Sequence, residues 1–366
     1  PWRQRQGRNK IYFISYVLEC FILFLGDDHM EELYLVTGAA GHLGNTIVRK
    51  LLAAHKEVRA FIIPGDNMPL TSDLLTVIEG NVCDKKSLKP FFANRGNKKT
   101  YVIHCAGIVS IASKYQQKVY DVNVNGTKNV LDLCLAEKVD KVVHVSSVHA
   151  IAELPAGQTI KETSTFDPDK VVGLYAKTKA EASAYALSLA DKGLDISIVH
   201  PSGIIGPYDY GHGHLQQLII DYMNHGLTAI VKGGYDFVDV RDVADGIIAC
   251  CQKGRKGECY LLTNQYYSVF EIMKLLHEIT GRKEIKTVLP MWFAKMSAPL
   301  AEIYYKIKKQ PPLYTSYSLY TLTSNALFSH EKATKELNYQ PRPLQETLQD
   351  TVDWLVEVKK IKPYKK

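Results

Sequence analysis

Thr37-Gly38-Ala39-Ala40-Gly41-His42-Leu43-Gly44 is the stretch of sequence that decides the fold. It begins where the short apolar run 33–37 ends, and it leads into residues 43–54, whose apolar side chains recur at helical spacing. A glycine triplet on its own often only turns the chain. Its position between a strand and an amphipathic helix, at the start of further strand and helix alternation, is what favours a ligand-binding turn.

Each glycine of this turn has a physical purpose. Gly38 allows a tight turn, Gly41 lets the backbone approach a pyrophosphate, and Gly44 lets the helix pack closely on the strand. The exposed N–H groups at the start of the helix then face the phosphates. The sequence therefore predicts a dinucleotide site formed by Gly38, Ala40, Gly41, His42, Leu43 and Gly44.

Strand and helix patterns alternate after this turn. Short runs rich in β-branched and apolar residues occur at 58–63, 75–78, 101–104, 142–145 and 196–199, and helical stretches such as 119–136 and 177–190 lie between them. Such alternation predicts an α/β fold of the Rossmann type, a doubly wound parallel sheet with helices on both faces. The alternation loosens after about residue 201, which indicates a smaller C-terminal substrate lobe.

We therefore expect a dinucleotide-binding domain over residues 30–200 and a mainly substrate-binding lobe over 201–355. Within that lobe, about 237–251 is expected to return a strand and a helix to the main sheet. Residues 1–29, a basic stretch followed by a short apolar run, are expected to be an extension outside the fold that precedes Met30, with a weak membrane anchor as the alternative. Residues 356–366 are expected to form a basic tail.

The charge and cysteine content of the 366 residues narrow the class of protein. Nine of the basic residues lie in the two tails, and without them the formal net charge of +7 becomes −2. A slightly acidic body is a poor nucleic-acid platform, so no nucleic-acid partner is expected, nor a membrane partner unless residues 1–29 act as an anchor. Seven cysteines, an odd number without a CxxC motif, favour reduced thiols and a cytoplasmic location.

Tyr175 and Lys179 form the candidate catalytic pair. They are four residues apart in Tyr175-Ala-Lys-Thr-Lys179, so on a helix they share one face. A nearby ammonium and an oxidised nicotinamide ring would lower the pKa of the tyrosine, which could then exchange a proton with an alcohol or carbonyl oxygen. Ser147, at the end of a predicted strand, could donate a hydrogen bond to the same oxygen.

The order of these motifs resembles the extended short-chain dehydrogenase/reductase family, the NAD-dependent epimerase/dehydratase superfamily, over about residues 30–355. Further matching stretches are Gly80-Asn-Val-Cys-Asp84, Val102-Ile-His-Cys-Ala-Gly107, Asn123-Val-Asn-Gly-Thr127, His200-Pro-Ser-Gly-Ile-Ile-Gly-Pro207 and Phe237-Val-Asp-Val-Arg-Asp-Val-Ala244. The resemblance implies Ser147, Tyr175 and Lys179 as the catalytic triad, with Lys179 also holding the nicotinamide ribose. It adds, as cofactor-binding residues, Asn81, Val82, Cys105, Ala106, Gly107, Asn123 and Pro201.

The same resemblance leaves the cofactor open between NAD and NADP. The tip of the second strand, Phe61-Ile-Ile-Pro-Gly-Asp66, has neither the acid that favours NAD nor the arginine that favours NADP. Asp66 lies late and Arg59 lies inside the strand. Asn81, where the family usually has an acid, is a second departure.

Within the family, the Ser-Ser motif and the loop from His200 are most similar to dihydroflavonol reductases and 3β-hydroxysteroid dehydrogenases. The expected function is an NAD(P)-dependent oxidoreductase acting on CH–OH groups. A nucleotide-sugar epimerase and a non-catalytic NAD(P)-sensing regulator are the alternatives. Dehydration is disfavoured, because Ser147-Val-His-Ala150 has no acidic pair after the serine.

The substrate lobe holds an aromatic-rich segment, with Trp292, Phe293, Tyr304, Tyr305, Tyr314, Tyr317 and Tyr320. These side chains could wall an apolar, ring-containing small molecule or form the core of the lobe. His212 and His214 are two residues apart without a third ligand nearby, so no metal site is expected. Asp239, Arg241 and Asp242 are expected to form structural ion pairs. A homodimer is a modest expectation by analogy with the family.

Overall fold

A seven-stranded parallel sheet forms the centre of the molecule. The computed structural model describes residues 31–111, 114–211, 213–298 and 315–364, so the predicted extension 1–29 lies outside the described residues. The strands of this sheet are β1 (Glu32–Thr37), β2 (Glu57–Ile62), β3 (Leu75–Glu79), β4 (Lys99–His104), β5 (Lys141–Val145), β6 (Ile196–Pro201) and β10 (Cys259–Leu262). The predicted α/β Rossmann-type fold is confirmed.

The strand order is β10-β6-β5-β4-β1-β2-β3. The chain winds outward from β1 in one direction to β3 and then in the other direction from β4 to β10, so the order reverses between β1 and β4. Their register pairs Thr37 with His104, which places both strand ends at the same edge. In such sheets the crevice at this reversal point, beyond the carboxyl ends of the strands, is where ligands bind.

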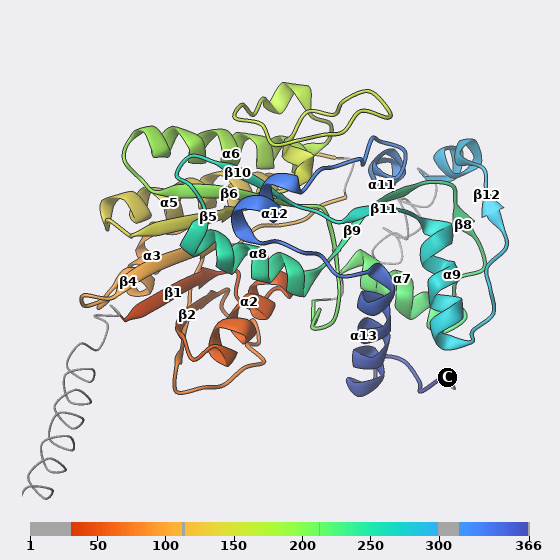
Figure 1. The fold of residues 1–366 in the computed structure, drawn as a ribbon, viewed down its shortest axis with the longest axis horizontal. Coiled ribbons are helices and arrows are strands. Elements are labelled where there is room, and N and C mark those ends of the chain that lie inside the picture. The colour runs from red at the N-terminus through yellow and green to blue at the C-terminus, as the bar shows by residue number, and fades with distance from the viewer. Residues whose placement is uncertain (1–30, 112–113, 212, 299–314, 365–366) are drawn as a thin grey trace, which may run out of the picture.

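Helices cover both faces of the sheet (Figure 1). Alternation along β1 explains why: Leu33 and Leu35 belong to one buried cluster, and Tyr34 and Val36 belong to the other. The first face is covered by α3 (Lys85–Phe92), α5 (Thr127–Ala136) and α6 (Leu174–Asp191). The opposite face is covered by α2 (His42–Ala53), α8 (Val240–Lys253) and α12 (Glu331–Leu337).

The predicted helix 119–136 is a continuous but irregular element. It consists of α4 (Gln117–Tyr120), a π-helical segment (Asp121–Gly126) and α5. Gly126 of this segment packs against Val82. A Cβ at position 126 would lie 2.7 Å from the Val82 side chain. Short 3-10 turns follow β5 (Val148–Ala150) and precede α6 (Pro168–Lys170).

The smaller lobe lies beyond the carboxyl ends of the strands, and in Figure 1 its helices α7, α9 and α13 stand to one side of the sheet. It comprises β7 (Gly203–Ile205), α7 (His214–Met223), β8 (Ile230–Val231), β9 (Gly234–Asp239), β11 (Gln265–Ser268), α9 (Val269–Thr280), β12 (Val288–Leu289), α11 (Ser316–Thr321) and α13 (Leu344–Glu357). Strands β11, β9 and β7 form one small sheet, and β12 pairs with β8. None of the helices in the described ranges is long and apolar enough to cross a membrane.

Two expectations about this lobe are wrong in part. The segment 237–251 does return its helix, α8, to the main sheet, but its strand β9 pairs with β7 and β11, and β10 provides the seventh strand instead. Residues 358–364, expected to be part of a solvated basic tail, pack back on α13. Ile361 is buried and the Tyr364 hydroxyl donates to Asp353, because these two side chains between the lysines carry apolar surface that the lobe covers.

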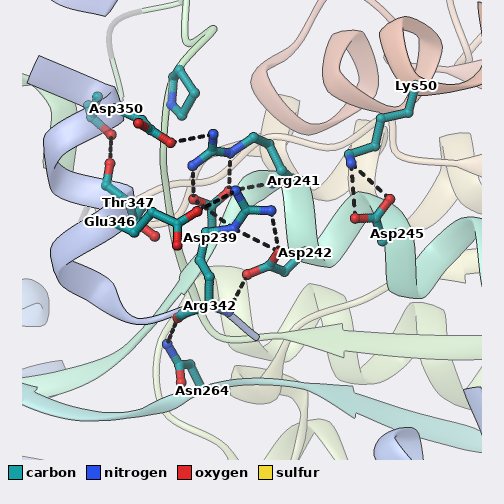
Figure 2. A network of polar contacts seen from close by, with 12 residues as sticks. Lys50, Asp239, Arg241, Asp242, Asp245, Asn264, Arg342, Glu346, Thr347 and Asp350 are labelled. Carbon is teal, nitrogen blue, oxygen red and sulfur yellow. Dashed lines mark hydrogen bonds and ion pairs between the residues drawn. The ribbon is translucent and has the colours of Figure 1, made fainter. Parts of the chain in front are cut away.

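A network of charged side chains joins the smaller lobe to the sheet (Figure 2). Asp239 is buried at the start of α8 and pairs with Arg241 at 2.7 Å, and Arg241 reaches Asp350 on α13 at 2.6 Å. Arg342 pairs with Asp242 at 2.7 Å and approaches Asp239 at 3.6 Å. Asp239 and Asp242, the two buried carboxylates of this network, therefore each have a cationic partner, and the three residues predicted to pair structurally do so.

The first turn of α2 lies in direct contact with the end of β1. A Cβ at Gly44 would lie 2.1 Å from the Gly38 carbonyl oxygen, and Gly38 itself has φ of +65°. Neither position accepts an ordinary side chain, because the first is blocked by backbone and the second needs a left-handed conformation.

Gly44→Ala is expected to lower the free energy of unfolding by about 1–3 kcal/mol, since helix and strand must move apart. Gly41→Ala is the matched control. Its Cβ would lie 3.3 Å from the same oxygen and its backbone is extended, so its melting temperature should stay close to that of the wild type. Thermal denaturation of both variants tests this; equal melting temperatures would contradict the packing argument.

Several histidines are buried in or beside the sheet in neutral form. Burial lowers the pKa of His104 to about 3 and that of His200 to about 4, and it holds the pKa of His144 well below its ordinary value. Neither ring nitrogen of His144 has a hydrogen-bond partner. The unfolded chain takes up these protons near pH 6.5 while the folded chain does not, so the stability is lost as the pH falls below that value.

We expect the melting temperature to fall steadily between pH 6.5 and pH 4, because each unit of depressed histidine pKa corresponds to about 1.4 kcal/mol. His144→Leu should weaken this acid dependence without lowering stability at pH 7.5, since no hydrogen bond is lost. His55→Asn, a substitution at an exposed left-handed position, is the control and should leave the profile unchanged. An unchanged acid limb in His144→Leu would refute the assignment.

Candidate active site

A cavity of about 580 Å³ lies at the reversal point of the sheet, between its strand ends and the smaller lobe. Its lining joins the dinucleotide turn to the catalytic candidates, which are almost 140 residues apart in the sequence. The predicted site residues that line it are Gly38, Gly41, His42, Leu43, Gly44, Cys105, Gly107, Ser147, Tyr175, Lys179 and Pro201.

The dinucleotide turn presents an unshielded helix start to this cavity. Gly41 caps α2 without any side-chain hydrogen bond, and no acidic residue occupies the first turn of the helix. The free N–H groups and the positive end of the helix dipole fit a pyrophosphate. The residues present therefore fit a dinucleotide cofactor, with the close approach at Gly44 keeping this helix start against β1.

A loop after β7 is fastened to the same turn from the other side. The His42 Nε2 lies 2.9 Å from the Pro207 carbonyl oxygen, and the Asn45 side chain donates to the Tyr208 carbonyl at 2.9 Å. The Arg49 guanidinium lies 4.3 Å from the centre of the Tyr208 ring. His42 thus holds the end of the stretch 200–207, which is one of those that match the family, and Asn45 and Arg49 hold Tyr208 just after it.

The candidate triad converges on the same cavity. Helix α6 begins after Gly173, so Tyr175 lies in its first turn and Lys179 follows one turn later, as the spacing predicts. Ser147 lies just beyond β5, and its side chain acts on Tyr175 by lowering the pKa of the phenol. All three residues are buried and face one cavity. Ser147 also caps the 3-10 turn after β5, accepting from the His149 N–H at 3.3 Å.

Burial dominates the electrostatics of this triad. It raises the pKa of Tyr175 to about 12, although the hydrogen bond with Ser147 opposes the shift. It also lowers the pKa of Lys179 to about 8. The Lys179 Nζ donates to the Val145 carbonyl at 2.8 Å. The pKa of Tyr175 is therefore not lowered by Lys179 in the protein alone, because desolvation of the phenolate outweighs a cation that is itself costly to bury.

Five predicted cofactor residues do not line the cavity: Ala40, Asn81, Val82, Ala106 and Asn123. Asn123 instead fixes the loop after β4. Its side-chain oxygen accepts from the Ile108 N–H at 2.7 Å, and its amide donates to the Ile108 carbonyl and to Thr178. Asn81 shapes its own turn by accepting from the Cys83 N–H at 2.9 Å.

The Arg59 side chain reaches from β2 to the end of α3. Its Nη1 donates to the carbonyls of Phe91 at 2.8 Å and Ala93 at 2.6 Å. One nitrogen of the guanidinium is thus engaged at a helix C-terminus, and Arg59 lies inside the strand rather than at its tip. Ile63, the residue after β2, is exposed.

An aromatic wall formed by His149, Tyr235 and Tyr317 completes the cavity opposite the dinucleotide turn. The His149 and Tyr235 rings stack at 5.4 Å, and their polar atoms are hydrogen-bonded at 3.0 Å. The aromatic-rich segment of the sequence points to Tyr317, but no pattern in it points to His149 or Tyr235. The position of His149, two residues after Ser147 at a strand end, was the available signal.

The remaining sequence candidates fall into three groups. Tyr304, Tyr305, Tyr314 and His212 lie outside the described residues. Trp292 and Phe293 are exposed, at 66% and 40%, rather than part of the wall. His214 lines the cavity, and the described residues contain no group of three or more side chains able to hold a metal ion.

Comparison with known proteins agrees with this geometry. Residues 34–263 match the model of the NAD dependent epimerase/dehydratase family. Sterol demethylase protein B of Methylococcus capsulatus is 31% identical, over 88% of this chain and 98% of its own length. A Synechocystis protein provisionally named a dihydroflavonol 4-reductase is 29% identical, over 89% of this chain and 95% of its own.

Among solved structures, the crystal structure of gox2253 superposes with a TM-score of 0.78 at 27% identity and covers 91% of this chain and 100% of its own. The family match explains why the dinucleotide turn and the catalytic candidates open on one cavity, and it makes NAD(P) the cofactor and a small molecule the substrate. The chain belongs to the NAD dependent epimerase/dehydratase family, the extended short-chain dehydrogenase/reductase enzymes.

Proposed function

We propose that this protein interconverts a ring-containing, largely apolar alcohol and its carbonyl compound, with Tyr175 as general acid and base. The observation that carries the proposal is the arrangement of the cavity. The dinucleotide turn, an aromatic wall and Ser147, Tyr175 and Lys179 all line it. Lys179 lies beside Gly107, and Tyr175 lies beside His149 of the wall. An aromatic wall is suited to flat rings, and the sterol in the name of a 31% identical relative supports the same substrate class.

In the proposed reaction, bound NAD(P) supplies the hydride acceptor or donor. Ser147 donates a hydrogen bond to the substrate oxygen and orients it. In the reduction direction, Tyr175 transfers its phenolic proton to that oxygen. Its pKa of about 12 keeps it protonated at neutral pH, as a general acid must be. In the oxidation direction it must first become a base, which requires a positive charge to offset its burial.

Lys179 has two roles in the proposal. Its amine donates to the Val145 carbonyl at the end of β5. It also lies next to Gly107, because a Cβ at Gly107 would be 3.4 Å from Nζ. From there it would hold the nicotinamide ribose. When charged, it would also stabilise the phenolate of Tyr175 during oxidation.

A nucleotide-sugar epimerase is the second candidate, since the family includes such enzymes by description. One observation disfavours it. Among the described residues that line the cavity, Lys179 is the only lysine or arginine, whereas a second diphosphate would call for cationic partners. Dehydration is also disfavoured, because Glu153, the first acid after Ser147, is occupied by the Tyr320 hydroxyl at 2.6 Å. A non-catalytic sensor would have no need of the buried triad.

The described cysteines are all unpaired: Cys83, Cys105, Cys134, Cys250, Cys251 and Cys259. Thiols in this state are typical of a reducing compartment, which supports the cytoplasm as the site of action.

Tyr175→Phe is expected to lower kcat/KM by about 10²–10⁴-fold while leaving cofactor affinity nearly unchanged, because only proton transfer is removed. The test uses the full chain with NAD⁺ or NADP⁺ and a panel of 3β-hydroxysteroids, decahydro-2-naphthol and UDP-glucose. Cofactor reduction is followed spectroscopically, and cofactor binding by calorimetry.

Tyr185→Phe is the matched control, because Tyr185 lies on the same helix but its hydroxyl bonds to Asp132 on α5. It should retain wild-type kinetics. Substrate-dependent cofactor reduction that survives in Tyr175→Phe would refute the mechanism. Conversion of UDP-glucose to its epimer without net cofactor reduction would establish the alternative function instead.

A further inference from the structure

His200 on β6 is a buried residue whose side chain reaches across to the end of the neighbouring strand. Its Nδ1 lies 2.9 Å from the Ser147 carbonyl oxygen. A carbonyl oxygen only accepts, so Nδ1 carries a proton and donates it. Burial lowers the pKa of His200 to about 4, so the ring is neutral at pH 7. The ring also stacks on Phe166, with 5.2 Å between the ring centres, which fixes the direction of the donor.

This hydrogen bond lies where the backbone ladder between β5 and β6 comes to an end. The Ser146 N–H still donates to the Val199 carbonyl at 2.8 Å. Pro201, two residues further along β6, has no N–H that could donate to the neighbouring strand. The imidazole of His200 supplies a donor in its place, and it ties β6 to Ser147 just beyond β5.

Ser147 begins a short turn whose geometry this donor anchors. Its carbonyl also accepts from the Ala150 N–H at 3.0 Å, which closes the 3-10 turn 148–150. Its hydroxyl oxygen accepts from the His149 N–H at 3.3 Å. Because the oxygen is engaged as an acceptor, the hydroxyl keeps its own proton to donate. His200 thus holds the turn on which the direction of the Ser147 hydroxyl depends.

Packing alone does not explain a histidine at position 200. Its Nε2 is buried and has no hydrogen-bond partner among the described residues. An unpaired buried nitrogen lowers stability, and an apolar side chain of similar size would avoid that loss. Local conflicts of this kind are expected where a residue serves function rather than folding. The bond to Ser147 is the interaction that an apolar residue could not make.

We propose that His200 is a positioning residue for the reaction at Tyr175, because it fixes, through the Ser147 carbonyl, the serine hydroxyl that orients the substrate oxygen. This inference rests on the proposed oxidoreductase function. His200 is not among the described residues that line the cavity, so it acts only through Ser147. Loss of the donor should therefore lower kcat more than it raises KM, and the loss should disappear when the Ser147 hydroxyl is absent.

Leucine and asparagine at position 200 provide the test, because their side chains have nearly the same shape and only asparagine has a donor at the δ position. The full chain is assayed at pH 7.5 with the panel alcohol that the wild type oxidises fastest. His200→Leu should lower kcat about tenfold and change KM by less than about twofold, since one neutral hydrogen bond is lost. His200→Asn should keep kcat within about threefold of the wild type.

His144→Leu is the matched control, because it removes a buried imidazole of β5 that makes no hydrogen bond. It should keep wild-type kinetics. Cofactor affinity, measured by calorimetry, should be unchanged in all three variants. If His200→Leu loses cofactor affinity together with turnover, the residue acts on the cofactor, and its role through Ser147 is overturned.

A double substitution separates positioning from a general effect on the fold. When His200→Leu is added to Ser147→Ala, kcat should fall by less than about twofold below that of Ser147→Ala alone. A further tenfold loss in this background, equal losses in His200→Leu and His200→Asn, or a wild-type kcat in His200→Leu would each overturn the assignment while the proposed function stands. If no alcohol of the panel reduces the cofactor with the wild type, the proposed function falls, and this inference with it.

Discussion

The contact between Gly44 and the Gly38 carbonyl is the constraint on which the rest of the structure depends. A Cβ at Gly44 would come within 2.1 Å of that oxygen, so the helix can approach the strand only because no side chain is present. This approach aims the uncapped start of α2 at the crevice where the strand order reverses. The carboxyl ends of β5 and β6 then bring Ser147 and Pro201 to the same cavity, and α6 adds Tyr175 and Lys179.

Burial sets the chemistry of this cavity more strongly than any charged pair does. It raises the pKa of Tyr175 to about 12 and lowers the pKa of Lys179 to about 8. Between these two pH values both groups favour their neutral forms in the protein alone. In the proposed mechanism, Tyr175 is therefore already protonated when it has to donate a proton. Proton abstraction by Tyr175 would need a positive charge nearby, and the burial that makes the phenolate costly also strengthens its attraction to such a charge.

The parts of the candidate site that depend on local spacing can be predicted from the sequence. The glycine turn, the helix with Tyr175 and Lys179, and Ser147 at a strand end all follow from short-range rules. The sheet to which β9 belongs could not be predicted, because the sequence of a strand followed by a helix is the same whether that strand joins the large sheet or pairs with β7. The pairing of His149 with Tyr235 could not be predicted either, since 86 residues separate them. Such contacts are set by how the smaller lobe folds over the sheet.

The cavity has two kinds of lining residue, those fixed by the sheet and those contributed by the smaller lobe. Residues near the cofactor come from strand ends and are fixed by the sheet, whereas Tyr235 and Tyr317 come from the smaller lobe, which the ion pairs of Arg241 and Arg342 hold to α8. Changes in the lobe can therefore alter which molecule is accepted without disturbing the triad. Gly173 is the exception, because its missing side chain lets Tyr317 of the lobe rest on the catalytic helix itself. The smaller lobe and the start of α6 are thus in contact at a single backbone position.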